Sequence, residues 1–160
     1  MKKILLVNPP VYDFSAYDLW AKPLALLYLS SILKKQNIEI EFFDYMDRLS
    51  SLIENTESNE YGCGHYIKKQ VEKPKVINDI KRNYFRFGIP KDTAENYFKT
   101  LNPPDVIIIG SVMTYWYIGV KEAVKSFKKI FPDTPIILGG VYATLCFEHA
   151  KTIKNIDDIV

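Results

Sequence analysis

The sequence predicts an α/β fold built on an open parallel sheet. Short apolar runs, rich in β-branched residues, alternate with longer segments in which apolar residues recur at helical spacing. Strands that alternate with helices in this way are joined by crossovers and form a parallel sheet with helices on both faces. The length of 160 residues fits one domain, and 48% hydrophobic and 25% charged residues are typical of a globular chain. We therefore expect a single domain over residues 1–160.

The first part of the chain supplies two predicted strands and a helix. Residues 4–7 form a continuous apolar run that ends at Asn8, which indicates a strand buried on both faces. After a polar and aromatic loop, a helix is predicted from Pro23 to near residue 37, because proline suits the first helical turn and leucines follow at helical spacing. Residues 38–43 alternate between apolar and acidic side chains before two phenylalanines, which predicts a second strand near a sheet edge.

The last third of the chain continues the alternation. Residues 106–109 are a β-branched run that predicts a central strand. Residues 117–131 place apolar side chains on one helical face and lysines on the other, and Pro132 ends this helix. The remaining predicted elements are a fourth strand at 135–138, a helix from about 144 to 154 and the start of a fifth strand at 157–160.

The expected strand order is the Rossmann-like (flavodoxin-like) order 2-1-3-4-5. Ligands of open α/β sheets bind at the carboxyl ends of the strands where the strand order reverses, which here lies between the first and third strands. The site is therefore expected in the loops after Asn8, Gly110 and Leu138.

Two features depart from this regular pattern. A long insert, from about residue 46 to 104 after the second strand, far exceeds an ordinary loop, so it is expected to hold structure of its own or to be functional. Its middle, residues 65–91, contains eight Lys and Arg against Glu72 and Asp79. The sequence also stops inside the fifth strand without the next covering helix, so we expect it to be the N-terminal piece of a longer protein.

Charge and cysteine content exclude several classes of protein. Lys and Arg number 21 against 19 Asp and Glu, a balance too even for the whole surface to attract nucleic acid or membrane. Cys63 and Cys146 cannot form a disulfide framework or hold an iron-sulfur cluster by themselves. No signal peptide and no apolar run long enough to cross a bilayer is present, so a cytoplasmic location without membrane contact is expected.

Glycines and small polar residues follow the third and fourth predicted strands. Gly139-Gly140 lets the backbone approach a ligand closely or adopt positive φ, although a tight strand-to-helix turn needs glycine for steric reasons alone. Ser111 and Thr114 supply hydroxyls beside the predicted switch point, and Met113 supplies an apolar arm. These residues are candidates for ligand contact.

Aromatic residues gather in the loops at the same end of the predicted sheet. They either line a pocket for a large planar ligand, anchor a partner domain, or cover the end of the sheet themselves. They are Tyr12, Phe14, Tyr17, Trp20, Tyr115, Trp116 and Tyr117.

Catalytic and metal-binding patterns are not found. His65 and His149 do not have the spacing of metal ligands, and no metal site is predicted. The glycine fingerprint of dinucleotide sites is replaced after the first strand by Asn8-Pro9-Pro10, and no nucleophile with a base and an orienting group can be assembled. Binding therefore fits the sequence better than catalysis.

Four segments, taken in order, resemble the N-terminal cobalamin-binding domain of radical SAM proteins. They are residues 3–10, 22–29, 104–111 and 137–144. The resemblance covers nearly the whole chain, and the 46–104 insert matches a subset of that family. In cobalamin domains a Ser-x-Leu-type segment and a Gly-Gly pair surround the nucleotide tail of the cofactor. Ser111-Val112-Met113 and Gly139-Gly140 lie at the matching positions.

The resemblance implies cobalamin as the cofactor of this domain. No histidine occurs between Met1 and Glu60, so ligation of cobalt by a histidine of the first loop is excluded. Radical SAM members often hold cobalamin with the lower face of cobalt unligated or water-bound. The cofactor-binding residues that we expect are Pro10, Tyr12, Ser111, Met113, Thr114, Tyr115, Gly139, Gly140, Ala143 and Thr144.

The resemblance also implies a partner, the C-terminal radical SAM barrel of the same polypeptide. That barrel binds an iron-sulfur cluster and S-adenosyl-L-methionine through a three-cysteine motif, which this sequence does not contain. Any methyl transfer or radical rearrangement is then a property of the full protein, and this domain is expected to be non-catalytic by itself.

Two other functions are compatible with the sequence. The same fold without cobalamin can serve as a docking or substrate-recognition domain, which predicts a pocket plugged by Tyr115, Trp116 or Met113. The basic stretch 65–91, with its interleaved aromatic residues, can contact RNA. A solvated insert whose aromatic side chains pack inward is the preferred interpretation of that stretch, so nucleic acid is not an expected partner.

Overall fold

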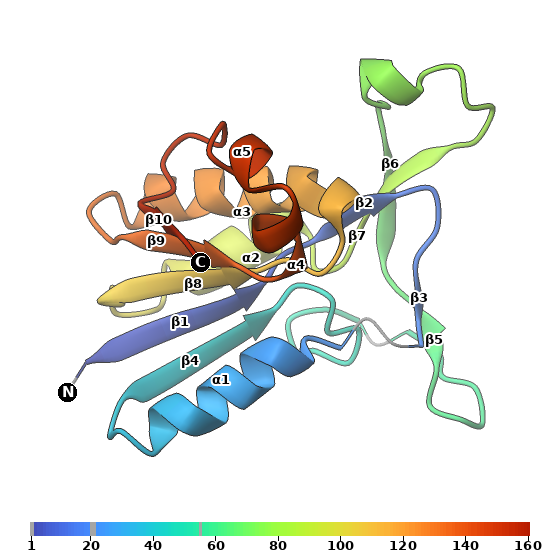
Figure 1. The fold of residues 1–160 in the computed structure, drawn as a ribbon. Helices are drawn as coiled ribbons and strands as arrows, with labels where there is room; N and C mark the ends of the chain where they lie inside the picture. The colour runs from blue at the N-terminus through green and yellow to red at the C-terminus, as the bar shows by residue number, and fades with distance from the viewer. Residues whose placement is uncertain (1, 20–21, 55) are drawn as a thin grey trace.

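The computed structural model describes residues 2–19, 22–54 and 56–160 of the chain. Its centre is a five-stranded parallel sheet with the order β4-β1-β8-β9-β10 (Figure 1). The strands are β1 (Lys3–Asn8), β4 (Glu39–Asp44), β8 (Val106–Gly110), β9 (Ile136–Gly139) and β10 (Asp158–Ile159). The prediction of an α/β fold around five parallel strands is confirmed.

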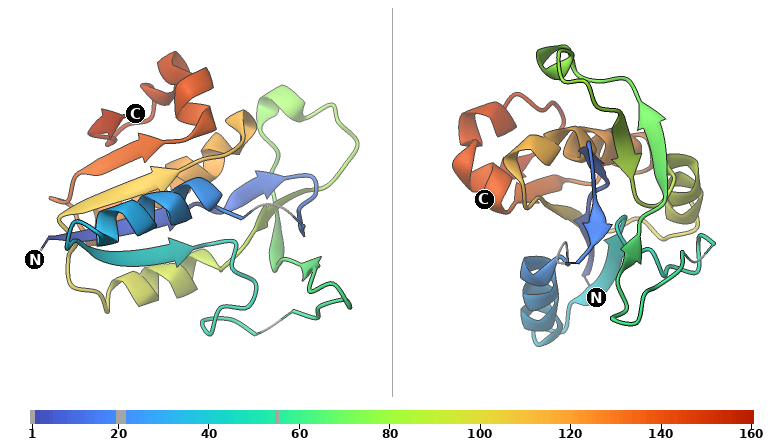
Figure 2. Two further views of the ribbon diagram at one scale, coloured as in Figure 1. Left: turned by 60° about the horizontal axis from the view of Figure 1, so that its bottom comes forward. Right: turned by 90° about the vertical axis from the view of Figure 1, so that its right-hand side faces the viewer.

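Helices lie on both faces of the sheet but cover them unequally. α2 (Lys91–Phe98) and α3 (Tyr117–Ile130) pack on one face, while α1 (Leu24–Lys34) lies on the other, over β1 and β4 (Figures 1 and 2). The main core lies on the α2–α3 side, where alternate residues of β1, β8 and β9 are fully buried. The opposite face is open beside α1, at the carboxyl ends of β8 and β9.

The prediction of one helix over residues 144–154 is wrong. The structure has two short helices instead, α4 (Val141–Leu145) and α5 (Phe147–Ala150). The first begins directly after Gly140, and the backbone of Cys146 leaves the helical region at φ −123° and ψ 41°. The two helices therefore meet at Cys146, and residues after 150 form turns that lead into β10.

The loop expected between the first strand and the first helix contains two strands. β2 (Val11–Asp13) pairs with β7 (Tyr84–Phe87), which also pairs with β6 (Lys68–Val71), and all these pairs are antiparallel. β3 (Tyr17–Asp18) pairs with β5 (Gly64–His65). The strands that pair with β2 and β3 lie about 50 to 75 residues later in the sequence. Local sequence therefore does not predict β2 and β3. A short 3-10 helix, η1 (Lys75–Ile77), lies between β6 and β7.

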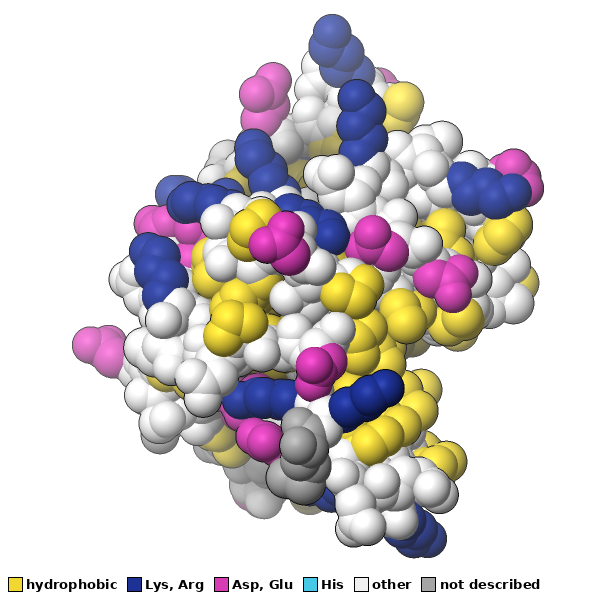
Figure 3. Space-filling model, turned by 90° about the vertical axis from the view of Figure 1, so that its left-hand side faces the viewer, with side chains coloured by type: hydrophobic (Ala, Val, Ile, Leu, Met, Phe, Trp, Pro, Cys, Tyr) yellow, Lys and Arg dark blue, Asp and Glu magenta, His cyan; other side chains and the backbone are white. Residues whose placement is uncertain are grey.

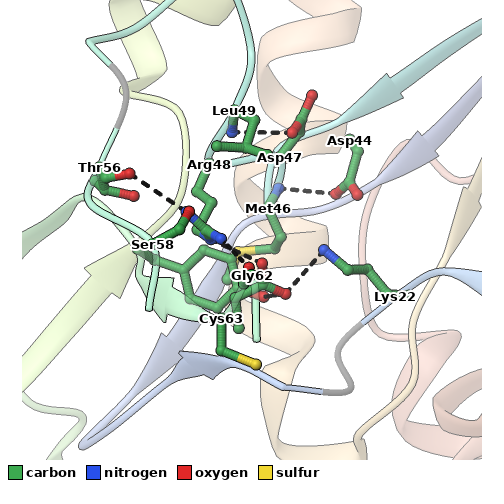
Figure 4. A network of polar contacts seen from close by, with 12 residues as sticks. Lys22, Asp44, Met46, Asp47, Arg48, Leu49, Thr56, Ser58, Gly62 and Cys63 are labelled. Carbon is green, nitrogen blue, oxygen red and sulfur yellow. Dashed lines mark hydrogen bonds and ion pairs between the residues drawn. The ribbon is translucent and has the colours of Figure 1, made fainter. Parts of the chain in front are cut away.

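A buried ion pair ties residues 48–66 to the first loop. Arg48 Nε donates to Asp18 Oδ2 at 2.8 Å, and the two side chains are only 1% and 6% exposed. Lys22 and Tyr66 contact the other carboxylate oxygen of Asp18. The guanidinium also donates to three further oxygens, those of Thr56 O, Ser58 Oγ and Gly62 O (Figure 4). This network holds the first loop and the start of the 46–104 segment together.

Within the described parts of the chain, no helix combines the length and apolar character needed to cross a membrane.

Candidate functional site

An apolar groove lies on the open face of the sheet, between α1 and the carboxyl ends of β8 and β9. Its volume is about 400 Å³. The space-filling view shows hydrophobic side chains gathered in a hollow on this side of the molecule (right-hand side of Figure 3). The apolar lining residues are Pro23, Leu24, Ala25, Leu26, Leu29, Ile108, Ile109, Val112, Val141 and Val160. Such a concave apolar site suits an apolar, planar group of a ligand.

Glycines form the floor of this groove. Gly140 has φ +96°, and a Cβ there would lie 2.6 Å from the carbonyl oxygen of Ser111, so this turn requires glycine. Gly139 differs, because a Cβ there would meet only the side chain of Val160, at 3.3 Å, and its backbone oxygen. Gly139 therefore keeps the floor open without being required by its own backbone conformation.

The turns after β8 and β9 are bonded to each other. Ser111 N–H donates to Gly139 O at 3.1 Å, and Tyr142 N–H donates to Ser111 O at 3.3 Å. Ser111 is buried, and within the described parts of the chain its hydroxyl makes one contact, a long one of 3.5 Å to Met113 O. A ligand in the groove can thus use the Ser111 hydroxyl as a hydrogen-bonding partner.

The ten predicted cofactor-binding residues separate into groups. Ser111, Gly139 and Gly140 line the groove. Tyr12 and Tyr115 line a second pocket, on the aromatic side of the first loop. The other five lie around these sites. Met113 and Thr114 are on the turn after β8, Ala143 is in the core, and Thr144 is exposed on α4. Pro10 is buried, and its carbonyl oxygen lies close to Gly119 of α3.

Sequence reasoning missed a polar pair beside the groove, in which Asn8 is buried and Asp44 is half-buried. Asn8 lines the groove, and its Nδ2 donates to Asp44 Oδ1 at 2.7 Å. The backbone N–H of Met46 donates to the same oxygen at 2.8 Å. Burial raises the pKa of the Asp44 carboxyl to about 6, against the lowering effect of these two hydrogen bonds. The only signal in the sequence is an Asp at the end of a predicted strand, which does not indicate burial.

The raised pKa of Asp44 predicts a pH-dependent stability. A carboxyl whose folded pKa is raised from 3.8 to about 6 binds more protons when folded, so folding becomes more favourable as pH falls from about 6 toward 4. The Asp44→Asn variant removes this contribution, since its amide stays uncharged. We expect the free energy of unfolding of the wild type, relative to Asp44→Asn, to fall by about 2 kcal/mol between pH 4 and pH 7. Urea unfolding of both proteins at the two pH values measures the difference, and parallel pH profiles would contradict the burial of this carboxylate.

His65 and His149 are not among the residues that line the groove. His65 packs edge-on against the ring of Tyr17, and His149 Nδ1 forms a hydrogen bond with the hydroxyl of Tyr142 at 2.7 Å. Among the described residues, no three His, Cys, Asp or Glu side chains are grouped as metal ligands would be.

Comparison with known proteins adds no identification. No protein-family model matches the chain, and no curated protein matches it.

Proposed function

We propose that this chain is a cobalamin-binding module of a radical SAM enzyme. The observation that carries the proposal is the groove, because its floor is made by the two turns that match the cobalamin motifs, Ser111-Val112 and Gly139-Gly140. The strand order β4-β1-β8-β9-β10 supports a Rossmann-like sheet, in which ligands bind at the carboxyl ends of the strands. The groove lies at that end.

The residues of the groove fit the nucleotide tail of cobalamin. The tail ends in a dimethylbenzimidazole, a flat and mostly apolar group, which matches a groove lined by leucine, isoleucine and valine side chains. The glycines at 139 and 140 let the ring approach the backbone, and the Ser111 hydroxyl can hydrogen-bond a ring nitrogen or the ribose. The corrin would then lie outside the groove at the carboxyl ends of the strands, and Met113 and Tyr115, on the segment after β8, are 40% and 55% exposed.

Cobalamin, when bound, supplies a cobalt centre that can carry a methyl group. The residues of this chain would bind and orient it: the apolar groove would hold the tail, and the turns at 111–112 and 139–140 would limit how deeply the tail enters. Both histidines of the chain make contacts elsewhere, with Tyr17 and Tyr142. In this proposal cobalt is held without a histidine from the first loop, and the chemistry belongs to a radical SAM barrel that uses an iron-sulfur cluster and S-adenosylmethionine.

The docking-domain alternative is less well supported. It predicts a groove plugged by Tyr115, Trp116 or Met113, but the residues that line the groove do not include these three. The open groove therefore favours a cofactor over a protein-docking role.

The RNA alternative has also lost its support. The aromatic residues of the basic stretch face inward: Tyr66, Tyr84 and Phe87 are buried. Lys68 covers the ring of the fourth, Phe85, at 4.8 Å. Single-stranded nucleic acid needs exposed aromatic faces on which bases stack, and this stretch does not offer them.

An absorbance titration with hydroxocobalamin tests the proposal. We expect a one-to-one complex of the 160-residue chain that co-elutes with the corrin on a sizing column, with band positions that show no histidine ligand to cobalt. Absence of both the spectral change and the co-elution would contradict cobalamin binding by this chain.

A further inference from the structure

The groove between α1 and the sheet has a polar end, at the carboxyl ends of β1 and β8. Its polar lining residues are Asn8, Lys22 and Ser111, and its other lining residues are apolar or glycine. Lys22 is largely exposed and its Nζ lies 2.8 Å from a carboxylate oxygen of Asp18. Asn8 and Ser111, in contrast, are only 7% and 3% exposed. Two buried polar side chains therefore lie at one end of an otherwise apolar groove.

The side chain of Asn8 lies on the face of the sheet where the groove opens. Leu5 and Val7 of β1 belong to the core on the α2–α3 side, and side chains alternate along a strand, so Asn8 points to the opposite face. Asp44 is the partner of Asn8 in the parallel pairing of β1 and β4. Its neighbour Phe43 belongs to the same core, so Asp44 also lies on the α1 side.

Asp44 fixes the orientation of the Asn8 amide. An ionised carboxylate accepts hydrogen bonds and cannot donate them, so the amide nitrogen faces it, and Asn8 Nδ2 donates to Asp44 Oδ1 at 2.7 Å. Within the described parts of the chain, the amide oxygen of Asn8, Oδ1, accepts no hydrogen bond. A buried acceptor without a partner is costly, and a ligand in the groove that carries a donor can satisfy it.

We propose that Asn8 selects a ligand that brings a hydroxyl group to the polar end of the groove. Asn8 Oδ1 is the acceptor, which makes Asn8 a binding residue, and Asp44 is a positioning residue that holds the amide. This inference rests on the proposed function, in which the group is a ribose hydroxyl of the nucleotide tail. In the base and its sugar the donors are the ribose hydroxyls, because the free ring nitrogen of dimethylbenzimidazole is an acceptor.

Titration with hydroxocobalamin, and with cobinamide, which lacks the tail, tests the role of Asn8. Asn8→Ala should bind hydroxocobalamin about ten-fold more weakly than the wild type, through loss of one hydrogen bond in a buried site. Its affinity for cobinamide should be unchanged. Asn102→Ala is the matched control, because Asn102 is exposed and precedes β8 at the amino end of the sheet. This control should bind both corrinoids as the wild type does, and circular dichroism shows whether each variant folds.

Asp44→Asn tests the positioning role while Asn8 is retained. The new amide can donate to Asn8 Oδ1, so it competes with the ligand for the acceptor. At a pH of about 7.5, hydroxocobalamin should bind this variant about five-fold more weakly than the wild type, and cobinamide equally well.

The dependence of this difference on pH separates positioning from a purely structural role. Protonation of Asp44 gives the wild type a donor that competes for Asn8 Oδ1 in the same way. The advantage of the wild type over Asp44→Asn should therefore disappear as pH falls from about 7.5 to about 5, since burial raises the pKa of the Asp44 carboxyl to about 6. The charged groups that act on Asp44 are Asp47 and Lys22, and the variant retains both.

The possible results distinguish the role of Asn8 from the function on which it rests. If the wild type binds neither corrinoid, the proposed function and the role of Asn8 both fail. If the wild type binds hydroxocobalamin and Asn8→Ala binds it equally well, the role of Asn8 alone is overturned. Equal weakening of both corrinoids would also overturn it, because cobinamide has no tail to contact. If Asn8→Ala does not fold, wild-type affinity of Asp44→Asn for hydroxocobalamin at the higher pH overturns the proposal.

Discussion

The Gly139→Leu variant is expected to lose hydroxocobalamin binding by at least about 100-fold, or roughly 2.7 kcal/mol, while it remains folded. A side chain at this position projects into the groove, where the only nearby atoms belong to Val160. Val160 is 70% exposed, so it can move aside, and the core on the opposite face of the sheet is untouched. The added side chain then occupies the space proposed for the nucleotide tail. The absorbance titration of the variant, together with its urea unfolding curve, measures both effects.

Gln70→Leu is the matched control for this variant. Gln70 is exposed on β6, away from the groove, and its replacement introduces the same leucine side chain at a position outside the proposed site. We expect its corrin affinity to equal that of the wild type. If Gly139→Leu binds the corrin as tightly as Gln70→Leu, the nucleotide tail does not lie in the groove.

The Arg48→Met variant is expected to lose about 3 kcal/mol of stability, because removal of one partner leaves the other charge of a buried pair uncompensated. Asp18 keeps its contacts with Lys22 and Tyr66, which places the cost at the lower end of the range for buried pairs. The carbonyl oxygens that accept from the guanidinium also lose their donor. Urea unfolding measures the loss, and Arg82→Met, at an exposed arginine, is the control with little expected effect.

The same network predicts how this loss depends on pH. Burial by itself would raise the pKa of Asp18, but hydrogen bonds from Lys22 and Arg48 hold that pKa below its ordinary value. The pair therefore stabilises the fold above the ordinary Asp pKa, and this contribution disappears as pH falls through the lowered value. A change of less than 1 kcal/mol for Arg48→Met at neutral pH would show that the pair does not anchor the 46–104 segment.

Local pattern was sufficient to predict the parallel strands but not the antiparallel ones. β1 is buried on both faces, and β8 and β9 are buried on one face and mostly half-buried on the other, so each is a run of apolar residues that is visible without knowledge of its neighbours. β2 and β3 are short and polar, and they exist because residues near 65 and 86 pair with them. The helix predicted at 144–154 was wrong for a similar reason, since its break at Cys146 has no proline or glycine to mark it.

The candidate site was predictable only in part. Ser111, Gly139 and Gly140 follow predicted strands, and the shared edge of a parallel sheet brings them together at the groove. Tyr12 and Tyr115 were grouped with them, but they line the separate aromatic pocket, because β2 carries the first loop away from the groove. The partial burial of Asp44 depends on neighbours from other elements, which no local pattern in the sequence encodes.

Comparison of hydroxocobalamin with cobinamide tests the central claim most directly. Cobinamide has the same corrin and cobalt but lacks the nucleotide tail. If the tail occupies the apolar groove between α1 and the turns at 111–112 and 139–140, the chain should bind cobinamide at least about 100-fold more weakly than cobalamin. Equal affinities for the two corrinoids would contradict a tail in the groove, and with it the function proposed for this chain.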